Sequence, residues 1–245
     1  MSKKLNFNEW NSWYQRIISD FGYNEDADKE AAELLEKMLK DQDSEKKLNR
    51  LKEIIENKCV LVYGCGPSLD RNISEIKRVG LNRVCPQIAA DGATSALLNK
   101  GIVPEIIVSD LDGRIEDIVS ANSKGAILVI HAHGDNIPAL KKFVKHMPGI
   151  IIGTTQTKQL THVFNFLGFT DGDRAVFLAN AMGAHTILLA GFDFGYHIGR
   201  YSKPNYKTDV SITPVKRKKL EYAKNLIGWL ASQTRTQIIN ITGAE

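Results

Sequence analysis

The stretch Cys59-Val-Leu-Val-Tyr-Gly-Cys-Gly-Pro-Ser68 joins an apolar run to a glycine-rich turn. Its first five residues, Cys59–Tyr63, form an unbroken apolar run, which is typical of a strand covered on both faces of a sheet. The glycines at 64 and 66 favour a tight turn into the helix predicted after them. This order of strand, turn and helix predicts the first unit of a parallel α/β sheet.

The same alternation of apolar runs and helical patterns continues to the end of the chain. Further strands are predicted at 84–89, 105–108, 126–130, 150–152, 186–190 and 237–241. Helices are predicted between them, near 71–79, 93–100, 114–122, 136–146, 173–183 and 215–231. The alternation favours a mostly parallel, doubly wound α/β sheet, in which ligands bind beyond the carboxyl ends of the strands. Residues 196–214 are predicted to form a long loop, and such loops often act as lids.

Residues 1–57 differ from the rest because they show helical periodicity throughout. Apolar residues recur on one helix face from Trp10 to Phe21, and two more amphipathic stripes follow, with a break at 41–44. An amphipathic face usually packs on a core, so a helical layer on the main domain is the simpler interpretation, with a lid or a dimerisation arm as the alternative. We therefore divide the chain into an N-terminal helical region, 1–57, and an α/β domain, 58–245.

The bulk composition excludes several classes of protein. The formal net charge of the 245 residues is +4, which is too small for a dedicated nucleic-acid-binding surface but suits an enzyme with anionic substrates. No apolar run approaches the ~20 residues of a membrane span, and the first residues lack the apolar core of a signal peptide. The three cysteines have no Cys-x-x-Cys spacing, so we do not expect a disulfide framework. A reducing compartment suits this pattern, and we expect a cytoplasmic location.

Carboxylates follow three successive predicted strands. Asp91 follows the second strand, Asp110 and Asp112 follow the third, and Asp135 follows the fourth. Grouped carboxylates repel one another unless a cation lies among them. Oxygen ligands with open water positions suit a Mg²⁺ ion that holds substrate phosphates. The pattern therefore predicts a magnesium–phosphate site built from these aspartates, which we take to be its metal ligands.

Other residues near the strand ends are suited to a phosphorylated ligand. A glycine-rich turn before a helix N-terminus favours phosphate, although this turn matches neither the dinucleotide fingerprint nor the P-loop. The residues expected to bind the nucleotide or its partner substrate are Gly64, Gly66, Pro67, Ser68, Asp91, Gly92, His133, Arg174 and Asp193. Basic residues that could close over phosphates are Arg200, Lys203 and the run 216–219, and the sequence does not choose among them.

The stretch His131-Ala-His-Gly-Asp135 matches part of the His-x-His-x-Asp-His zinc motif of metallo-β-lactamase-like hydrolases. Asn136 stands where the final histidine of that motif belongs. A magnesium ligand at Asp135 is therefore favoured over a zinc site, and the histidines are expected to bond substrate oxygens or phosphate.

In combination, these motifs resemble two families of pyrophosphokinase. The segments Ala90–Ala93 and Ser109–Asp112 are similar to the thiamin pyrophosphokinase signature, with Ser109 in place of a glycine and Gly113 in place of a final serine. The fuller resemblance is to the archaeal 6-hydroxymethyl-7,8-dihydropterin pyrophosphokinases. The motifs shared with that family are Gly64–Leu69, Ala90–Ala93, Ser109–Asp112, His131–Asn136, Gly168–Ala175 and Ala190–Gly195.

The resemblance implies a Rossmann-like, thiamin-pyrophosphokinase-like fold and Mg²⁺-dependent transfer of diphosphate from ATP to a reduced pterin, with release of AMP, in folate or methanopterin biosynthesis. It implies that Asp110 and Asp112 hold Mg²⁺ with support from Asp91 and Asp135, and we take Asp110, Asp112 and Asp135 as catalytic. No nucleic acid or membrane partner is expected. The sequence leaves the oligomeric state open, with a homodimer as one possibility because the related thiamin enzymes are dimers. The alternatives are a thiamin pyrophosphokinase and a metal-dependent Asp-x-Asp glycosyltransferase.

Overall fold

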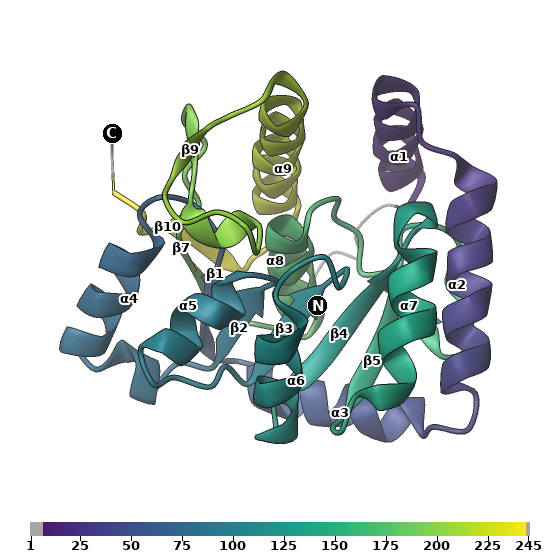
Figure 1. The fold of residues 1–245 in the computed structure, drawn as a ribbon, viewed down its shortest axis with the longest axis horizontal. Coiled ribbons are helices and arrows are strands. Elements are labelled where there is room, and N and C mark those ends of the chain that lie inside the picture. Colours follow the sequence, from purple (N-terminus) through teal and green to yellow (C-terminus); the bar gives the residue numbers. More distant parts are fainter. Residues whose placement is uncertain (1–6, 244–245) are drawn as a thin grey trace.

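The computed structural model describes residues 7–243, and a sheet of eight parallel strands forms its centre (Figure 1). The strand order is β10-β7-β1-β2-β3-β4-β5-β6. The strands are β1 Cys59–Tyr63, β2 Gln87–Ala90, β3 Ile106–Ser109, β4 Ile127–Ala132, β5 Ile151–Thr155, β6 Val163–Phe164, β7 Thr186–Ala190 and β10 Gln237–Asn240. Strands β2 to β6 lie in sequence order on one side of β1, and β7 and β10 lie on its other side. The sheet is therefore doubly wound, as predicted, and its strand order reverses beside β1.

Helices cover both faces of this sheet. They are α1 Phe7–Phe21, α2 Glu25–Leu39, α3 Ser44–Ile55, α4 Leu69–Arg78, α5 Ala93–Asn99, α6 Ile115–Ser123, α7 Ile137–Phe143, α8 Asp171–Ala181 and α9 Pro214–Gln233. Alternate residues of one strand enter different cores: Val60 and Val62 pack with α1, α3, α8 and α9, whereas Leu61 and Tyr63 pack with α4 and α5. A third core joins α2, α6 and α7 to β3, β4 and β5.

The N-terminal helices pack against the sheet as a layer. Asp28 of α2 is buried and ties them to the strand ends, because it accepts hydrogen bonds from the Tyr14 hydroxyl (2.8 Å), the Gln156 side chain (2.7 Å) and the Gly134 backbone N–H (2.8 Å). Trp13 of α1 also lies against the rings of α9. Residues 1–6 of the predicted region lie outside the described part, and the domain boundary at 57/58 stays a prediction.

The structure departs from the predicted elements at three places, one of which is the short edge strand β6, which was not predicted. The second strand begins at Gln87 rather than at 84, because a 3₁₀ turn occupies residues 81–83 and leaves Val84 74% exposed. The predicted loop 196–214 contains a small antiparallel pair, β8 His197–Ile198 and β9 Val210–Ser211. No helix within residues 7–243 combines the length and the apolar character needed to cross a membrane.

Candidate active site

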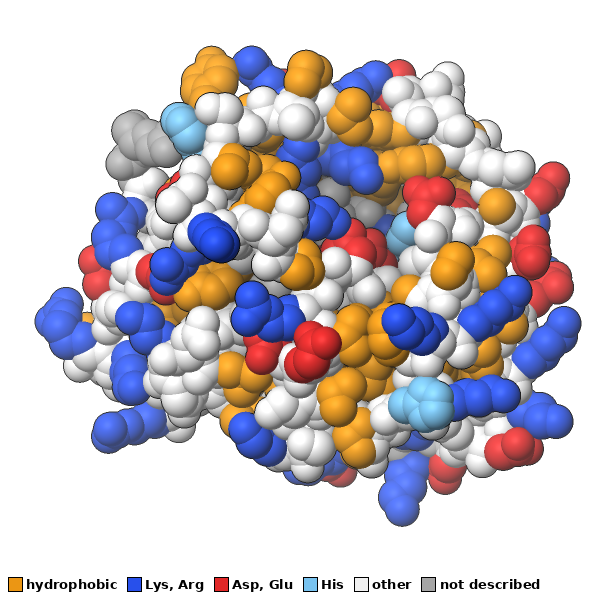
Figure 2. All heavy atoms as spheres, viewed as in Figure 1, with side chains coloured by type: hydrophobic (Ala, Val, Ile, Leu, Met, Phe, Trp, Pro, Cys, Tyr) orange, Lys and Arg blue, Asp and Glu red, His pale blue; other side chains and the backbone are white. Residues whose placement is uncertain are grey.

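A cavity of about 400 Å³ lies at the carboxyl edge of the sheet, a volume typical of small-molecule sites. Its walls come from the loops after β1, β2, β3, β4 and β7, the turn between α1 and α2, and the first turns of α8 and α9. Figure 2 shows a hollow on this face, where basic side chains lie above acidic ones and a histidine. The predicted site residues that line it are Gly64, Gly66, Asp91, Asp110, Asp112, His133, Asp135, Arg174 and Asp193.

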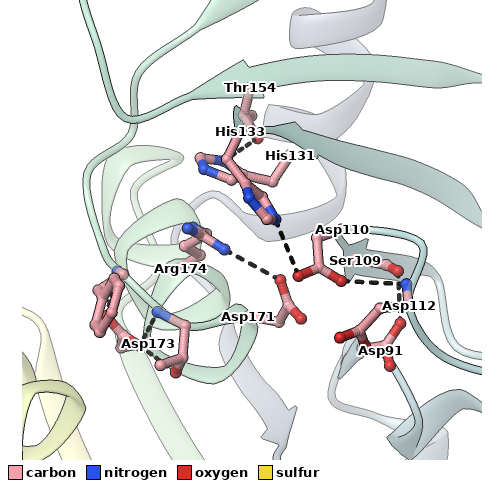
Figure 3. A network of polar contacts seen from close by, with 12 residues as sticks. Asp91, Ser109, Asp110, Asp112, His131, His133, Thr154, Asp171, Asp173 and Arg174 are labelled. Atoms are coloured by element: carbon pink, nitrogen blue, oxygen red, sulfur yellow. Dashed lines mark hydrogen bonds and ion pairs between the residues drawn. The ribbon is translucent and has the colours of Figure 1, made fainter. Parts of the chain in front are cut away.

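Three carboxylates meet at the floor of this cavity. One oxygen atom from each of Asp91, Asp110 and Asp171 lies within 4.8 Å of the other two. Figure 3 shows these side chains converging from the ends of β2 and β3 and from the start of α8. Within residues 7–243, no second group of three histidine, cysteine or acidic side chains is close enough to share a metal ion.

The backbone that presents two of these aspartates is held in a rare conformation. Asp91 has a φ of 43° and Leu111 a φ of 67°, in the left-handed region that costs a residue other than glycine ~1–3 kcal/mol. The buried Ser109 hydroxyl holds this turn by donating to Asp91 Oδ1 (2.6 Å) and accepting from the Leu111 N–H (2.8 Å). Such strain persists only where the surroundings fix it, and it is concentrated at functional sites.

Burial and mutual repulsion shift the acidity of the cluster. Burial and the charges of Asp110 and Asp112 raise the pKa of Asp91 to about 7. Burial and the Asp110 charge also raise the pKa of Asp171 well above its usual value. Burial would raise the pKa of Asp110 too, but the contact with His133 (3.3 Å) and the positive charges around it hold that pKa at about 2. The cluster therefore concentrates negative charge that a divalent cation would neutralise.

Asp112 and Asp135 lie outside this triad. Asp112 forms an ion pair with Lys203 of the 196–214 loop, and its backbone N–H donates to Asp110 Oδ1 (3.2 Å). Asp135 is exposed at the rim of the cavity. The geometry thus favours Asp171 as the third ligand, and metal binding or catalysis by Asp112 and Asp135 stays a prediction.

Asp171 was not predicted as a site residue, because an aspartate at the start of a helix commonly serves as its cap. Thr170 is the N-cap, and Asp173 completes the cap by accepting from the backbone N–H groups of Phe169 (2.6 Å) and Thr170 (2.7 Å). Asp171 is thereby free to face the cavity, where it pairs with Arg174 (3.3 Å). The spacing of two residues puts these aspartates on different sides of the helix start, which is the signal that could have separated them.

The glycine-rich turn is filled by the protein itself. The N–H and hydroxyl groups of Ser68, just before α4, both donate to Asp193 Oδ2 (3.1 and 2.7 Å). A Cβ atom on Gly66 would lie 2.6 Å from the Gly191 carbonyl oxygen and would overlap the Asp193 carboxylate. Gly66 therefore permits close packing between the β1 and β7 loops, and the Asp193 carboxylate occupies the helix start that we predicted for phosphate.

Three predicted ligand-binding residues are absent from the cavity lining. These residues are Pro67 and Ser68, at the end of the glycine-rich turn, and Gly92, on which a Cβ atom would overlap the Tyr201 carbonyl oxygen. The structure therefore gives no geometric support for direct contact between these three residues and a ligand, and that contact stays a prediction.

The two histidines do not form a zinc pair. His131 is buried and its Nδ1 lies 3.2 Å from the Thr154 hydroxyl oxygen, whereas His133 reaches the cavity and contacts Asp110 (Figure 3). His133 is placed to orient the Asp110 carboxylate.

Comparisons with known proteins identify the family of this chain. Residues 17–199 match the family model described as 6-hydroxymethylpterin diphosphokinase MptE-like. The 6-hydroxymethyl-7,8-dihydropterin pyrophosphokinase of Methanothermobacter thermautotrophicus is 47% identical over 90% of this chain and 93% of its own length. Proteins of the same name from Methanocaldococcus jannaschii and Pyrococcus furiosus are 42% and 44% identical, over 96% and 97% of this chain and 100% of their own lengths.

A more distant likeness concerns the fold alone. The structure of the Maf glycosyltransferase from Magnetospirillum magneticum AMB-1 superposes with a TM-score of 0.50 at 15% identity. The match covers 75% of this chain but only 34% of the glycosyltransferase. Since the family model spans most of the chain and three relatives exceed 40% identity over nearly all of it, this chain belongs to the 6-hydroxymethylpterin diphosphokinase MptE-like family.

Proposed function

We propose that this chain transfers the terminal diphosphate of ATP to the hydroxymethyl group of 6-hydroxymethyl-7,8-dihydropterin, with Mg²⁺ as the metal. The acceptor oxygen bonds to the β-phosphorus as the bond from that phosphorus to the α,β-bridging oxygen breaks, and AMP leaves while the hydroxyl proton passes to solvent. The reaction is that named for the archaeal relatives. The observation that carries the proposal is the convergence of the Asp91, Asp110 and Asp171 carboxylates inside the cavity.

The three carboxylates fit a hard divalent cation. Their ligand atoms are all oxygen and lie within 4.8 Å of one another, and burial together with repulsion from the Asp110 carboxylate raises the pKa values of Asp91 and Asp171. Mg²⁺ bound there would neutralise charge on the phosphate oxygens of the donor.

The remaining side chains position groups rather than exchange protons. His133 orients Asp110, and Arg174 holds Asp171 through one guanidinium nitrogen and Gln156 Oε1 through another (3.2 Å). The rings of Tyr23 and Phe169 line the same cavity and offer apolar surface to a flat heterocycle. Positioning and electrostatic stabilisation are the main sources of catalysis in phosphoryl transfer, so this arrangement suits the proposed reaction.

The test is product analysis by chromatography after incubation of the protein with ATP and Mg²⁺, separately with the reduced pterin and with thiamin. We expect equal amounts of AMP and pterin diphosphate, and their loss with a chelator or in Asp110→Asn. AMP formed only with thiamin would move the chain to the thiamin pathway. No AMP with either acceptor would refute pyrophosphokinase activity and would favour a nucleotide-sugar donor, which thermal shifts with a nucleotide-sugar panel would reveal.

The proposal includes a homodimer, the predicted cytoplasmic location and the predicted lack of nucleic-acid or membrane partners. Light scattering on the purified full chain tests the first of these, and a monomer at micromolar concentration would contradict it.

A further inference from the structure

Most basic residues in and around the cavity already form ion pairs, including Arg174 with Asp171 and Lys203 with Asp112 in its lining. Arg200 pairs with Asp70 (3.0 Å), Arg217 pairs with Glu221 (3.3 Å), and Lys218 pairs with Asp20 (3.1 Å). None of these three cations lines the cavity. Because these three side chains form ion pairs at the surface and lie outside the cavity lining, they are poor candidates for ligand binding.

Lys216 and Lys219 behave differently. Both line the cavity, together with Leu220 and Ala223, at positions i, i+3, i+4 and i+7 of α9. This spacing puts them on one face of the helix, pointing inward. Within residues 7–243, neither ammonium group lies within ion-pair distance of a carboxylate. Two half-buried lysines thus face a ligand cavity with their charges uncompensated.

The two lysines lie near different features of the cavity. Lys216 lines the same cavity as Gly64, Cys65 and Gly66 of the glycine-rich turn. The Lys219 ammonium lies above the rings of Phe21 (6.0 Å), Tyr23 (5.5 Å) and Phe169 (5.9 Å). Together they flank the cavity from the glycine-rich turn to the aromatic wall, whereas the aspartates occupy its floor.

We propose that Lys216 and Lys219 bind the phosphate chain of the nucleotide donor, from another wall of the cavity than that of the aspartate triad. This inference rests on the proposed function, and it assigns the anion site to α9 rather than to the start of α4, where Asp193 already accepts from Ser68. Lysine is a compact charge that binds phosphate without fixed geometry, which suits a chain of several phosphates that shifts as the reaction proceeds.

The test measures binding separately from turnover. The full chain with Mg²⁺ is titrated calorimetrically with inorganic tripolyphosphate, with the non-transferable analogue α,β-methylene-ATP and with the reduced pterin. The variants are Lys216→Met, Lys219→Met and the double variant, which remove charge while keeping the aliphatic stem. Lys224→Met is the matched control, because Lys224 is an exposed lysine of the same helix outside the cavity.

We expect each cavity variant to weaken tripolyphosphate and the analogue about 10- to 100-fold, the range for a lost hydrogen bond to a charged group. The pterin affinity of Lys216→Met and the melting temperature of every variant should stay at the control values, and the salt dependence of tripolyphosphate binding should diminish in the double variant. Lys219→Arg should recover most of the binding, whereas a merely structural lysine would lower the melting temperature instead.

Tripolyphosphate binding by the double variant as tight as by Lys224→Met would overturn the inference, as would a wild-type chain that does not bind tripolyphosphate. The binding result does not depend on AMP formation. A chain that binds tripolyphosphate through these lysines yet forms no AMP would refute the proposed reaction and keep the phosphate site.

Discussion

Replacing Asp171 with asparagine tests whether the third carboxylate of the triad is a metal ligand. The Asp171 carboxylate, which is only partly exposed, lies beside those of Asp110 and Asp91, and desolvation with the Asp110 charge raises its pKa. Because the folded state disfavours the ionised form, a neutral asparagine should stabilise the metal-free protein near neutral pH. The asparagine oxygen can still accept from Arg174, so the local packing is kept.

The magnitude of the metal effect follows from linkage. At a Mg²⁺ concentration of ~100 Kd, binding to the native state stabilises it by ~2.7 kcal/mol. For a chain of this size, 1 kcal/mol shifts the melting temperature by ~2–4 °C, so the wild type should gain ~5–11 °C. If losing one of three ligands weakens Mg²⁺ binding ~100-fold, the same concentration leaves ~0.4 kcal/mol and a shift of only ~1–2 °C.

The assay is thermal unfolding in EDTA and in rising MgCl₂, followed by circular dichroism. Asp26→Asn is the control, because Asp26 is an exposed residue of α2 that pairs only with Lys29 at the surface. This control should show the full Mg²⁺ shift. If the melting temperature of Asp171→Asn rises with Mg²⁺ as much as that of the wild type, Asp171 is not a metal ligand. If the variant melts at a lower temperature than the wild type in EDTA, the lost pairing with Arg174 outweighs the relief of repulsion among the carboxylates.

Three further substitutions probe the loops around the triad. Asp112→Asn should lower turnover at least ~100-fold with an unchanged melting curve, because it removes a preorganised charge; near-normal AMP formation in the chromatographic assay would remove Asp112 from the site. Gly66→Ala should cost ~1–3 kcal/mol in urea unfolding, because its methyl group collides with the Gly191 carbonyl and displaces Asp193; a Gly228→Ala control, with open space around the added atom, should lose no stability by collision. Asp28→Asn should cost ~1–3 kcal/mol in the same assay, because an amide cannot accept the three hydrogen bonds that the carboxylate accepts; a change under 0.5 kcal/mol would show that this contact does not hold the N-terminal helices.

The strands that could be predicted from the sequence are those with a long apolar signal. Residues 59–63 and 186–190 occupy the predicted positions, because both apolar runs are continuous and both strands are paired with a neighbour on each side. The two-residue strand β6 was not predicted, since two residues cannot display a period. Its position at the sheet edge depends instead on pairing of Gly153 and Thr154 with Val163 and Phe164.

Some site residues could be predicted from the local sequence, whereas others depend on contacts between distant segments of the chain. Asp91 and Asp110 follow strongly marked strands, so their meeting at the carboxyl edge could be predicted from topology alone. Asp171 comes from a helix start 61 residues beyond Asp110, and only the capping by Asp173 leaves it free to join them. The glycine-rich turn illustrates the converse, because its local pattern suits phosphate but a contact with Asp193 from the β7 loop fills it.

The distribution of charge explains why an acidic cavity can accept an anionic donor. The carboxylates of Asp91, Asp110 and Asp171 would repel the phosphates of ATP if they faced them alone. A divalent cation among them would offset most of this negative charge and offer the phosphates a positive centre, and the ammonium groups of α9, which form no ion pair within residues 7–243, supply further positive charge from another wall of the cavity. The donor needs both parts of the cavity. A metal ion held by the aspartates would bind the phosphates near the β-phosphorus, and the two lysines would neutralise the remaining charge of the phosphate chain. The helix α9 is therefore as much a part of the site as the strand ends, although its basic run has the appearance of a solvated surface in the sequence.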